Sequence, residues 1–321
     1  MAINLLELKP HKVSRDLSGY ITFIYGGYKT GKTTLATQME GALLLAFEPG
    51  YNALPGVIAQ DITTWGEMKQ VYRDLKKPEV KQVFKAVIVD TIDVAADYCK
   101  KYICQQNGIE ELGDLGYGKG WSKFKDEFND VFRGLTQMGY AVFFLGHDKE
   151  AKDDKGNITN IRPGLSNSTR EIIGGMADIY GYAKQGAAGE NSVLVLRDKT
   201  GFIECGCRFK YVPEVIPMNY KALTDAIFNA IDKEAMEHGN QYVTEERAAC
   251  VEVATYDYEA LMTEFNNLAS DLMTKNQSNG MKIVAIVEKY LGKGKKVAET
   301  TPDQAEFIFL IVSEIKDELM K

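Results

Sequence analysis

Short apolar runs recur along the first two-thirds of the chain, and longer amphipathic stretches separate them. The runs are rich in β-branched and aromatic residues, as buried strands are. They cover residues 21–25, 42–47, 86–90, 141–145, 193–196 and 208–212. Apolar residues at three- and four-residue spacing predict helices over residues 64–77, 94–106, 121–138 and 219–238. This alternation predicts an α/β fold with a mainly parallel sheet between helices.

The end of the chain shows helical periodicity alone. Apolar residues repeat at helical spacing over residues 256–274 and 280–291. Thr301 then opens a third helix, with Pro302 in its first position. We therefore expect a first domain over residues 1–238, a linker over 239–255 and a small three-helix domain over 256–321.

Composition narrows the class of protein. The 321 residues are 45% apolar and 26% charged, which is enough for a sizeable core. A net charge of −7 disfavours a wholesale polyanion binder, although it leaves room for a local basic groove. The five cysteines include no C-x-x-C pair, so no disulfide framework is expected. With no apolar run of about 18 residues and no signal-like N-terminus, we expect a cytoplasmic protein without membrane contact.

One glycine-rich stretch carries a specific motif. Residues 26–33 read GGYKTGKT and match G-x-x-x-x-G-K-[ST] in full, between a predicted strand and a helix opening. Glycines allow such a loop to turn its N–H groups toward phosphates. We expect Lys32 to reach the β- and γ-phosphates of ATP and Thr33 to ligate Mg²⁺. The residues expected to bind the nucleotide are Gly26, Gly27, Tyr28, Lys29, Thr30, Gly31, Lys32, Thr33 and Thr34.

Three polar residues follow predicted buried strands. Glu48, Asp90 and His147 each stand at the carboxyl end of one, where open α/β sheets bind ligands. Asp90 ends the run AVIVD, a Walker B form, and is expected to hold Mg²⁺ together with Thr33. For His147, a functional role and an ordinary polar contact are equally compatible with the pattern. Asp93 is interpreted as a charge that begins a helix.

Polar stretches offer further candidates. Residues 107–120 contain five glycines and could be a binding loop or a plain solvent loop. Residues 149–170 are long and polar, and we expect a flexible excursion there that could be a binding loop. The basic turn at 292–296 could contact a phosphate backbone or be simply solvated. Arg208 is one of several basic residues on the last predicted strands, and it could reach the γ-phosphate of a neighbouring subunit.

The order of these features resembles the RecA-like ATPase core over about residues 21–215. Glu48 in LAFEPGYNAL matches the glutamate that orients the attacking water in bacterial RecA. Asp90 in AVIVDTID matches the Walker B aspartate. His147 in VFFLGHD matches the sensor position, where RecA itself has glutamine.

The same resemblance implies partners. Residues 107–120 and 149–170 take the positions of the two DNA-binding loops. The N-terminal polymerisation helix and linker of full RecA are not seen. The chain looks similar to phage-encoded, core-only RecA-like ATPases of single-strand annealing and recombination. That likeness implies an ATPase that binds single-stranded DNA in the host cytoplasm, assembles into a ring or filament, and meets a single-strand-binding protein.

Two functions follow from these observations. In the first, Lys32, Glu48, His147 and Arg208 serve ATP hydrolysis, with Arg208 acting in trans, and single-stranded DNA is the second ligand. In the second, ATP gates assembly or the binding of a protein partner without direct action on DNA. The acidic composition favours the second function, and the order of elements favours the first.

Overall fold

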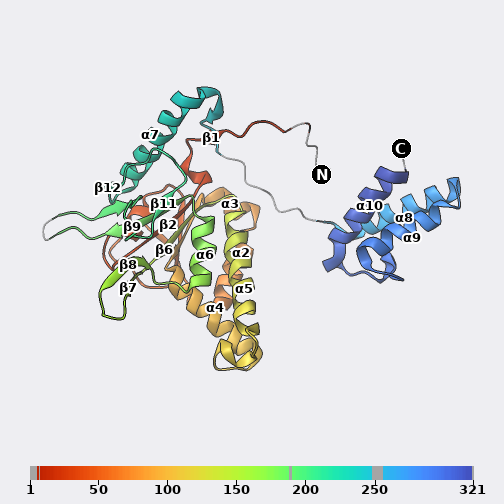
Figure 1. Ribbon diagram of the computed structural model, residues 1–321, viewed down its shortest axis with the longest axis horizontal. Helices are drawn as coiled ribbons and strands as arrows, with labels where there is room; N and C mark the ends of the chain where they lie inside the picture. Colours follow the sequence, from red (N-terminus) through yellow and green to blue (C-terminus); the bar gives the residue numbers. More distant parts are fainter. Residues whose placement is uncertain (1–5, 7, 188–189, 248–255, 320–321) are drawn as a thin grey trace. The chain divides into compact units, whose positions relative to one another are not determined.

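The computed structural model describes residue 6 and residues 8–187, 190–247 and 256–319. The chain divides into two compact units between residues 252 and 253. The first unit contains a central sheet with helices, and the second unit is helical (Figure 1).

The central sheet of the first unit is mainly parallel. Its strands are β2 (Ile21–Gly26), β3 (Ala42–Ala46), β4 (Ile58–Asp61), β5 (Ala86–Asp90), β6 (Ala141–Gly146), β9 (Ile179–Lys184), β10 (Val193–Val195), β11 (Gly206–Cys207) and β12 (Val215–Pro217). They lie in the order β12-β10-β9-β2-β6-β5-β3-β4, and β11 also pairs with β9. Every pair from β9 to β4 is parallel, whereas β10, β11 and β12 are antiparallel additions. The carboxyl ends of β2, β3, β5 and β6 therefore meet at one edge.

Helices cover both faces of this sheet. They are α1 (Lys32–Thr37), α2 (Trp65–Asp74), α3 (Pro78–Val83), α4 (Ile92–Asn107), α5 (Lys119–Thr136), α6 (Asn167–Met176) and α7 (Tyr220–His238). Helices α2, α4, α5 and α6 share one buried core and gather beside the sheet (Figure 1). Helices α1 and α7 share the other core. In β2, Phe23 and Tyr25 enter the first core and Ile24 enters the second, because successive side chains of a strand point to opposite faces. The predicted α/β fold class is confirmed.

Two local predictions are wrong. Residues 208–212 are a turn, and the edge strand is β12 instead. Phe209 is buried because its ring packs edge-on against Tyr20, at 4.9 Å between centroids, so its apolar character does not report strand pairing. The helix predicted over 64–77 ends at Asp74, and Pro78 opens α3, since proline fits the first turn of a helix.

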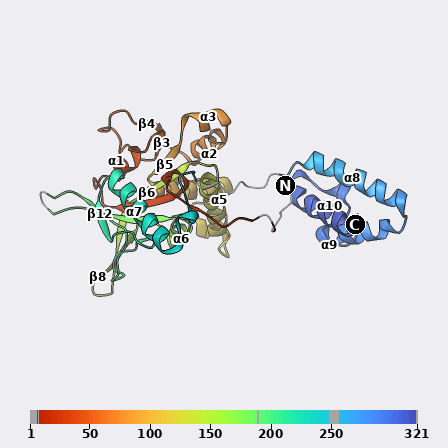
Figure 2. The same ribbon diagram turned by 90° about the horizontal axis from the view of Figure 1, so that it is seen from above.

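The polar excursion at 149–170 is ordered. It forms an antiparallel hairpin of β7 (Asp148–Lys152) and β8 (Ile158–Pro163), and then enters α6. The hairpin projects from the sheet (Figure 2). Asp153 closes its turn by accepting hydrogen bonds from the backbone N–H groups of Lys155 and Asn157 at 2.9 and 2.8 Å. Such side-chain turns let a polar sequence form regular structure, so the expectation of a flexible loop is wrong.

The glycine-rich stretch at 107–120 is also structured. It contains the 3₁₀ helix η3 (Leu112–Leu115), in which Leu112 is buried. Gly120 lies so close to this helix that an added Cβ atom would stand 2.1 Å from the Leu112 carbonyl oxygen. The stretch therefore packs as a compact tip between α4 and α5.

The first unit extends past its expected end at residue 238. The 3₁₀ helix η4 (Asn240–Tyr242) and the strand β13 (Val243–Thr244) follow α7, and β13 pairs with β1 (Val13–Ser14) in parallel. Arg247 donates a 2.8 Å hydrogen bond to the Ser18 carbonyl. Residues 239–247 thus belong to the folded unit, and the remainder of the expected linker, 248–255, lies outside the described residues.

The second unit is a small helical bundle. Helices α8 (Tyr258–Lys275), α9 (Asn279–Leu291) and α10 (Ala305–Leu319) enclose a core of their own (Figure 2). A capping box of Thr301 and Gln304 precedes α10, as the sequence indicates. In the described part of the chain, no helix combines the length and apolar character needed to cross a membrane.

Candidate nucleotide site

The glycine loop after β2 has the backbone that its sequence requires. Gly26 has a φ of +155°, and an added Cβ atom there would lie 2.3 Å from the Ala183 carbonyl oxygen on the neighbouring strand. Gly31 has a φ of +93° at the start of α1. These are conformations that glycine adopts without strain. The loop can therefore curl tightly between β2 and α1.

Lys32 points back into this loop. Its Nζ atom donates hydrogen bonds to the carbonyl oxygens of Gly26 and Gly27 at 2.9 and 2.8 Å. Burial lowers the pKa of Lys32, against the attraction of Asp90 and other nearby carboxylates. The ammonium group is thus held at the centre of the loop, where a phosphate chain would compete with the two carbonyls for it.

Thr33 and Asp90 form the second part of the site. The Thr33 hydroxyl donates a 2.7 Å hydrogen bond to Asp90 Oδ2. Burial raises the pKa of Asp90, and the bond to Thr33 and the charge of Lys32 oppose this effect. A hydroxyl oxygen and a buried carboxylate side by side match the ligands that Mg²⁺ prefers. These two residues fit the magnesium site expected from the sequence.

Glu48 follows the carboxyl end of β3. Its neighbour Phe47 donates a backbone hydrogen bond to the Asp90 carbonyl at 2.7 Å, which fixes the two strand ends together. Burial raises the pKa of Glu48, while the charge of His147 lowers it. The side chain is 37% exposed and faces the nucleotide pocket.

His147 follows the carboxyl end of β6 and is bound from two sides. Its Nδ1 atom lies 2.6 Å from Asp93 Oδ2, and its Nε2 atom lies 3.5 Å from Glu48 Oε2. The Tyr28 ring covers the imidazole, with 4.4 Å between ring centroids. The hydrogen bond to Asp93 raises the pKa of His147. Burial acts to raise the pKa of Asp93, but the hydrogen bond and charge of His147 lower it overall.

These residues line one pocket of about 740 Å³ at the carboxyl edge of the sheet. Its wall contains Tyr28, Lys29, Thr30, Gly31, Lys32, Thr33, Thr34, Glu48, Asp90 and His147. Gly26 and Gly27 lie directly beneath, through their bonds to Lys32. The structure therefore brings together every site residue predicted from the sequence except one.

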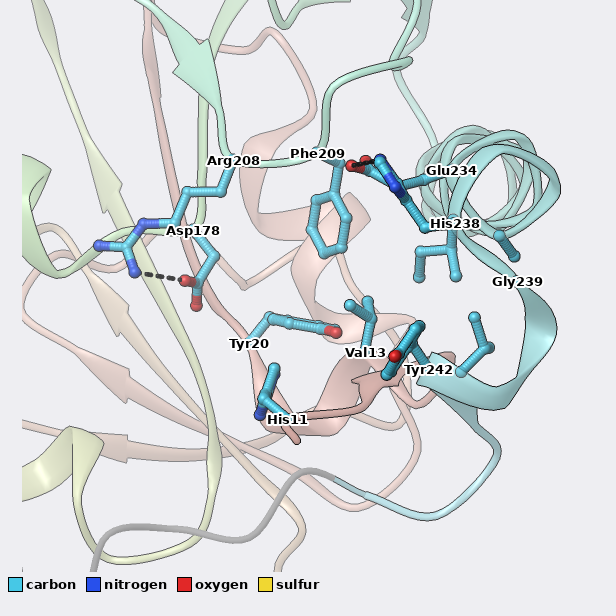
Figure 3. A pocket seen from close by; sticks show the side chains of 13 residues that line it. His11, Val13, Tyr20, Asp178, Arg208, Phe209, Glu234, His238, Gly239 and Tyr242 are labelled. Carbon is cyan, nitrogen blue, oxygen red and sulfur yellow. Dashed lines mark ion pairs between the residues drawn. The ribbon is translucent and has the colours of Figure 1, made fainter. Parts of the chain in front are cut away.

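That exception is Arg208. It lines a separate pocket of about 360 Å³, and its side chain turns toward Asp178 (Figure 3). Its guanidinium forms a 3.1 Å ion pair with Asp178 and a 3.0 Å hydrogen bond to the Gly175 carbonyl. Asp178 in turn accepts a hydrogen bond from Ile21, the first residue of β2. Arg208 therefore stands at the opposite edge of the sheet, outside the nucleotide pocket of its own chain.

Asp93 is the site residue that sequence reasoning missed. It lies in the first turn of α4, three positions after Asp90, where an acidic residue is common. Asp93 is the last residue of the sequence TID after the Walker B strand. Its role could have been predicted only by knowing that His147 follows the neighbouring strand. The pairing of β5 with β6 makes the two strands neighbours.

Fold and site together define a P-loop nucleotide-binding protein. The chain belongs to the family described as AAA domain, whose model matches residues 18–203, more than half of the chain. The SPbeta prophage-derived uncharacterized protein YorG of Bacillus subtilis (strain 168) is 28% identical over 331 aligned positions, covering 99% of each chain. The crystal structure of the RadB recombinase matches with a TM-score of 0.39 and 19% identity, over 64% of this chain and 90% of that one. A TM-score of that size does not establish a shared fold.

Proposed function

We propose that this protein hydrolyses ATP and uses the nucleotide cycle to act on single-stranded DNA in phage recombination or strand annealing. The observation that carries the proposal is the convergence of Lys32, Glu48, Asp90 and His147 on one pocket. A phosphate-binding loop, a metal-binding corner and a carboxylate able to face water are the parts that phosphoryl transfer to water requires. A cytoplasmic location is part of the proposal.

Hydrolysis would proceed by in-line attack of water on the γ-phosphorus. Glu48 would orient the water and accept its proton as the new P–O bond forms. The bond between the γ-phosphorus and the β,γ-bridging oxygen would break, and ADP would leave with that electron pair. Burial raises the pKa of Glu48, which makes its carboxylate a better proton acceptor than an exposed one.

Lys32 would leave its two loop carbonyls and bind the phosphates. The exchange replaces neutral acceptors by charged ones, which makes the new hydrogen bonds stronger. Asp90 and Thr33 would hold Mg²⁺, and the ion would neutralise charge on the phosphates. His147 would offer Nε2 to the pocket beside Glu48.

The β7–β8 hairpin supports a link from this pocket to a second ligand. Both of its ends meet at His147: Asp148 is the next residue, and the Gly164 N–H donates a 2.8 Å hydrogen bond to the His147 carbonyl. Tyr182 on β9 adds a 3.3 Å hydrogen bond to Asp148. A shift of His147 toward a bound phosphate would therefore move the root of the hairpin.

The tip between α4 and α5 supports single-stranded DNA as that ligand. Tyr117 is fully exposed between two glycines, and Trp121 is half exposed nearby. Exposed aromatic rings next to lysines such as Lys119 suit the stacking of unpaired bases. Trp65, which follows the carboxyl end of β4, donates a 2.8 Å hydrogen bond to Glu127 of α5, so α5 passes the same edge of the sheet as the nucleotide site on its way from the tip.

An ATP-gated module for a protein partner is the second candidate. The observation that favours it is the mixed charge of the hairpin, where Glu150, Asp153 and Asp154 offset the lysines. A surface without a net basic field attracts nucleic acid only weakly. In this candidate the hairpin would still follow His147, but it would present its surface to a protein.

The test is steady-state ATP turnover at low salt with and without a single-stranded oligonucleotide. Lys32→Ala serves as the blank, and Lys221→Ala is the matched control because that lysine is exposed on α7. The proposal expects turnover that the oligonucleotide stimulates, and a Tyr117→Ala variant that needs about tenfold more oligonucleotide. Turnover that ignores the oligonucleotide would reject the DNA function in favour of the partner module. Absence of turnover would reject hydrolysis.

A further inference from the structure

The imidazole ring of His147 is fixed at its Nδ1 atom, and its Nε2 atom faces the pocket. On its Nδ1 side the ring is held by Asp93 Oδ2 at 2.6 Å, and on one face it is covered by Tyr28. The backbone N–H of His147 also donates to Asp93 Oδ1, at 3.4 Å. Two contacts between the same pair of residues leave little freedom for the ring to rotate.

The Nε2 atom of His147 is directed toward Glu48. His147 Nε2 stands 3.5 Å from Glu48 Oε2, and the Glu48 side chain is 37% exposed, against 14% for His147 and 20% for Asp93. The three side chains thus form a row in which His147 lies between the two carboxylates, and Glu48 is the end that is most open to the pocket. A bound phosphate would meet the Glu48 end of the row first.

The groups around the ring favour its protonated form. Asp93 on α4 and Glu48 after β3 flank the imidazole, and Asp90 on β5 adds a third carboxylate. Burial of the ring and the charge of Lys32 on α1 oppose them, but the hydrogen bond to Asp93 has the largest effect and the pKa of His147 is raised. A ring protonated at both nitrogens can donate to Asp93 and to Glu48 at once.

We infer that Asp93 is a positioning residue for ATP hydrolysis: it holds His147 so that Nε2 directs the Glu48 carboxylate in the nucleotide pocket. The inference rests on the proposed function, because Glu48 is the group that would face the attacking water. Asp93 itself does not reach the pocket and would touch neither water nor nucleotide. It would act through His147 alone.

A purely structural role makes a different prediction. An acid in the first turn of a helix stabilises that helix through the charge of the exposed N–H groups, and any substitution that keeps the fold would then leave turnover intact. If Asp93 instead positions His147, removing its carboxylate should change both the ionisation of His147 and the rate of ATP turnover.

The experiment compares the wild type with Asp93→Asn. The matched control is Asp97→Asn on the same helix, where the carboxylate is exposed and pairs with Lys100. Imidazole NMR titration follows His147, which is easily assigned because the chain has only three histidines. ATP turnover and the Kd for ATP are measured on the same samples.

We expect His147 of the wild type to titrate above the usual value of about 6.5, and to titrate at lower pH in Asp93→Asn. The same variant should lose roughly 10²-fold in kcat, with the Kd for ATP changed less than about threefold. Asp97→Asn should match the wild type in all three measurements. The wild-type titration is informative even if Asp93→Asn does not fold.

Two results would overturn the inference. One is a His147 that titrates at or below about 6.5 in the wild type, or equally in the wild type and Asp93→Asn. The other is a variant in which the titration shifts and kcat stays the same. A wild type without any turnover would instead refute the proposed function, and with it the link to hydrolysis. The titration would then still decide whether Asp93 holds the His147 ring.

Discussion

The Thr33 hydroxyl donates its hydrogen to the Asp90 carboxylate across 2.7 Å, although 57 residues separate the two in sequence. The bond joins the end of the phosphate-binding loop to the tip of the next strand but one in the sheet. Both side chains are candidates for holding Mg²⁺, because the hydroxyl could offer a lone pair to the ion while its hydrogen still points at the carboxylate.

This relationship predicts the effect of Asp90→Asn. The amide keeps a hydrogen-bond acceptor for Thr33 but removes the charge that would hold the ion. We expect the wild type to bind ATP at least about tenfold more tightly with Mg²⁺ than without it, and the variant to bind equally in both conditions. Calorimetric titration with and without Mg²⁺ measures this. If Mg²⁺ still increases the affinity of the variant for ATP, Asp90 is not a ligand of the metal ion.

The pair of His147 and Asp93 predicts how stability depends on pH. The hydrogen bond to Asp93 raises the pKa of His147, so protonation of the ring stabilises the folded state. That contribution is complete below the unfolded pKa of about 6.5 and is lost as pH rises through the folded pKa. The lowered pKa of Asp93 adds a contribution that is present above about 3.8 and lost only as pH falls further.

We therefore expect the free energy of unfolding of the wild type to exceed that of His147→Gln most strongly near pH 5 to 6. The difference should shrink toward pH 9. Urea unfolding of both proteins across this range measures it. A difference that grows with pH would mean that His147 is stabilised as the neutral ring.

The close approach of Gly120 to η3 predicts an intolerant position in a stretch that looks flexible. Gly120→Ala would place a Cβ atom 2.1 Å from the Leu112 carbonyl oxygen and should reduce the free energy of unfolding by about 1–3 kcal/mol. Gly113→Ala is the matched control, because an added Cβ there meets no atom within 4 Å. Its effect should stay within about 0.5 kcal/mol. Equal effects of the two substitutions would show that the tip is not packed in solution.

The pairing of β1 with β13 predicts where the first unit can be cut. A chain ending after Arg247 should bind ATP as tightly as the full chain, because it keeps β13 and the bond from Arg247 to Ser18. A chain ending after His238 loses both, together with the contact of Arg15 with Glu245, and should unfold at a lower temperature. Thermal unfolding and ATP titration of the two chains measure this. Equal unfolding temperatures would show that residues 239–247 do not stabilise the first unit and act as a linker.

The sequence predicts which residues lie together at this pocket because its parts are local. The glycine loop, Lys32 and Thr33 lie within one motif, and Asp90 and Glu48 follow apolar runs whose strands can be recognised separately. Parallel pairing then places their carboxyl ends at one edge without further information. The assembly of these residues needs no long-range detail beyond the order of strands.

Other features depend on contacts that periodicity does not encode. Asp93 acquires its partner only when β5 and β6 lie side by side and orient His147 toward α4. Phe209 lies in an apolar run that resembles a strand in the sequence. In the structure it is in a turn, where it is buried against the ring of Tyr20. The hairpin at 148–163 is closed by the side chain of Asp153, a specific bond inside a polar run.

The most direct measurement follows the fate of ATP in the Glu48→Gln variant. The amide keeps the size of the side chain but cannot accept a proton from water, so the variant should bind ATP with a Kd within about threefold of the wild type and turn it over at least roughly 10²-fold more slowly. Rapid-quench analysis of radiolabelled ATP under single-turnover conditions, with Lys32→Ala as the blank, should find ATP intact on the variant and ADP on the wild type. Formation of ADP at the same rate on both proteins would contradict the assignment of Glu48 and the chemistry proposed for this pocket.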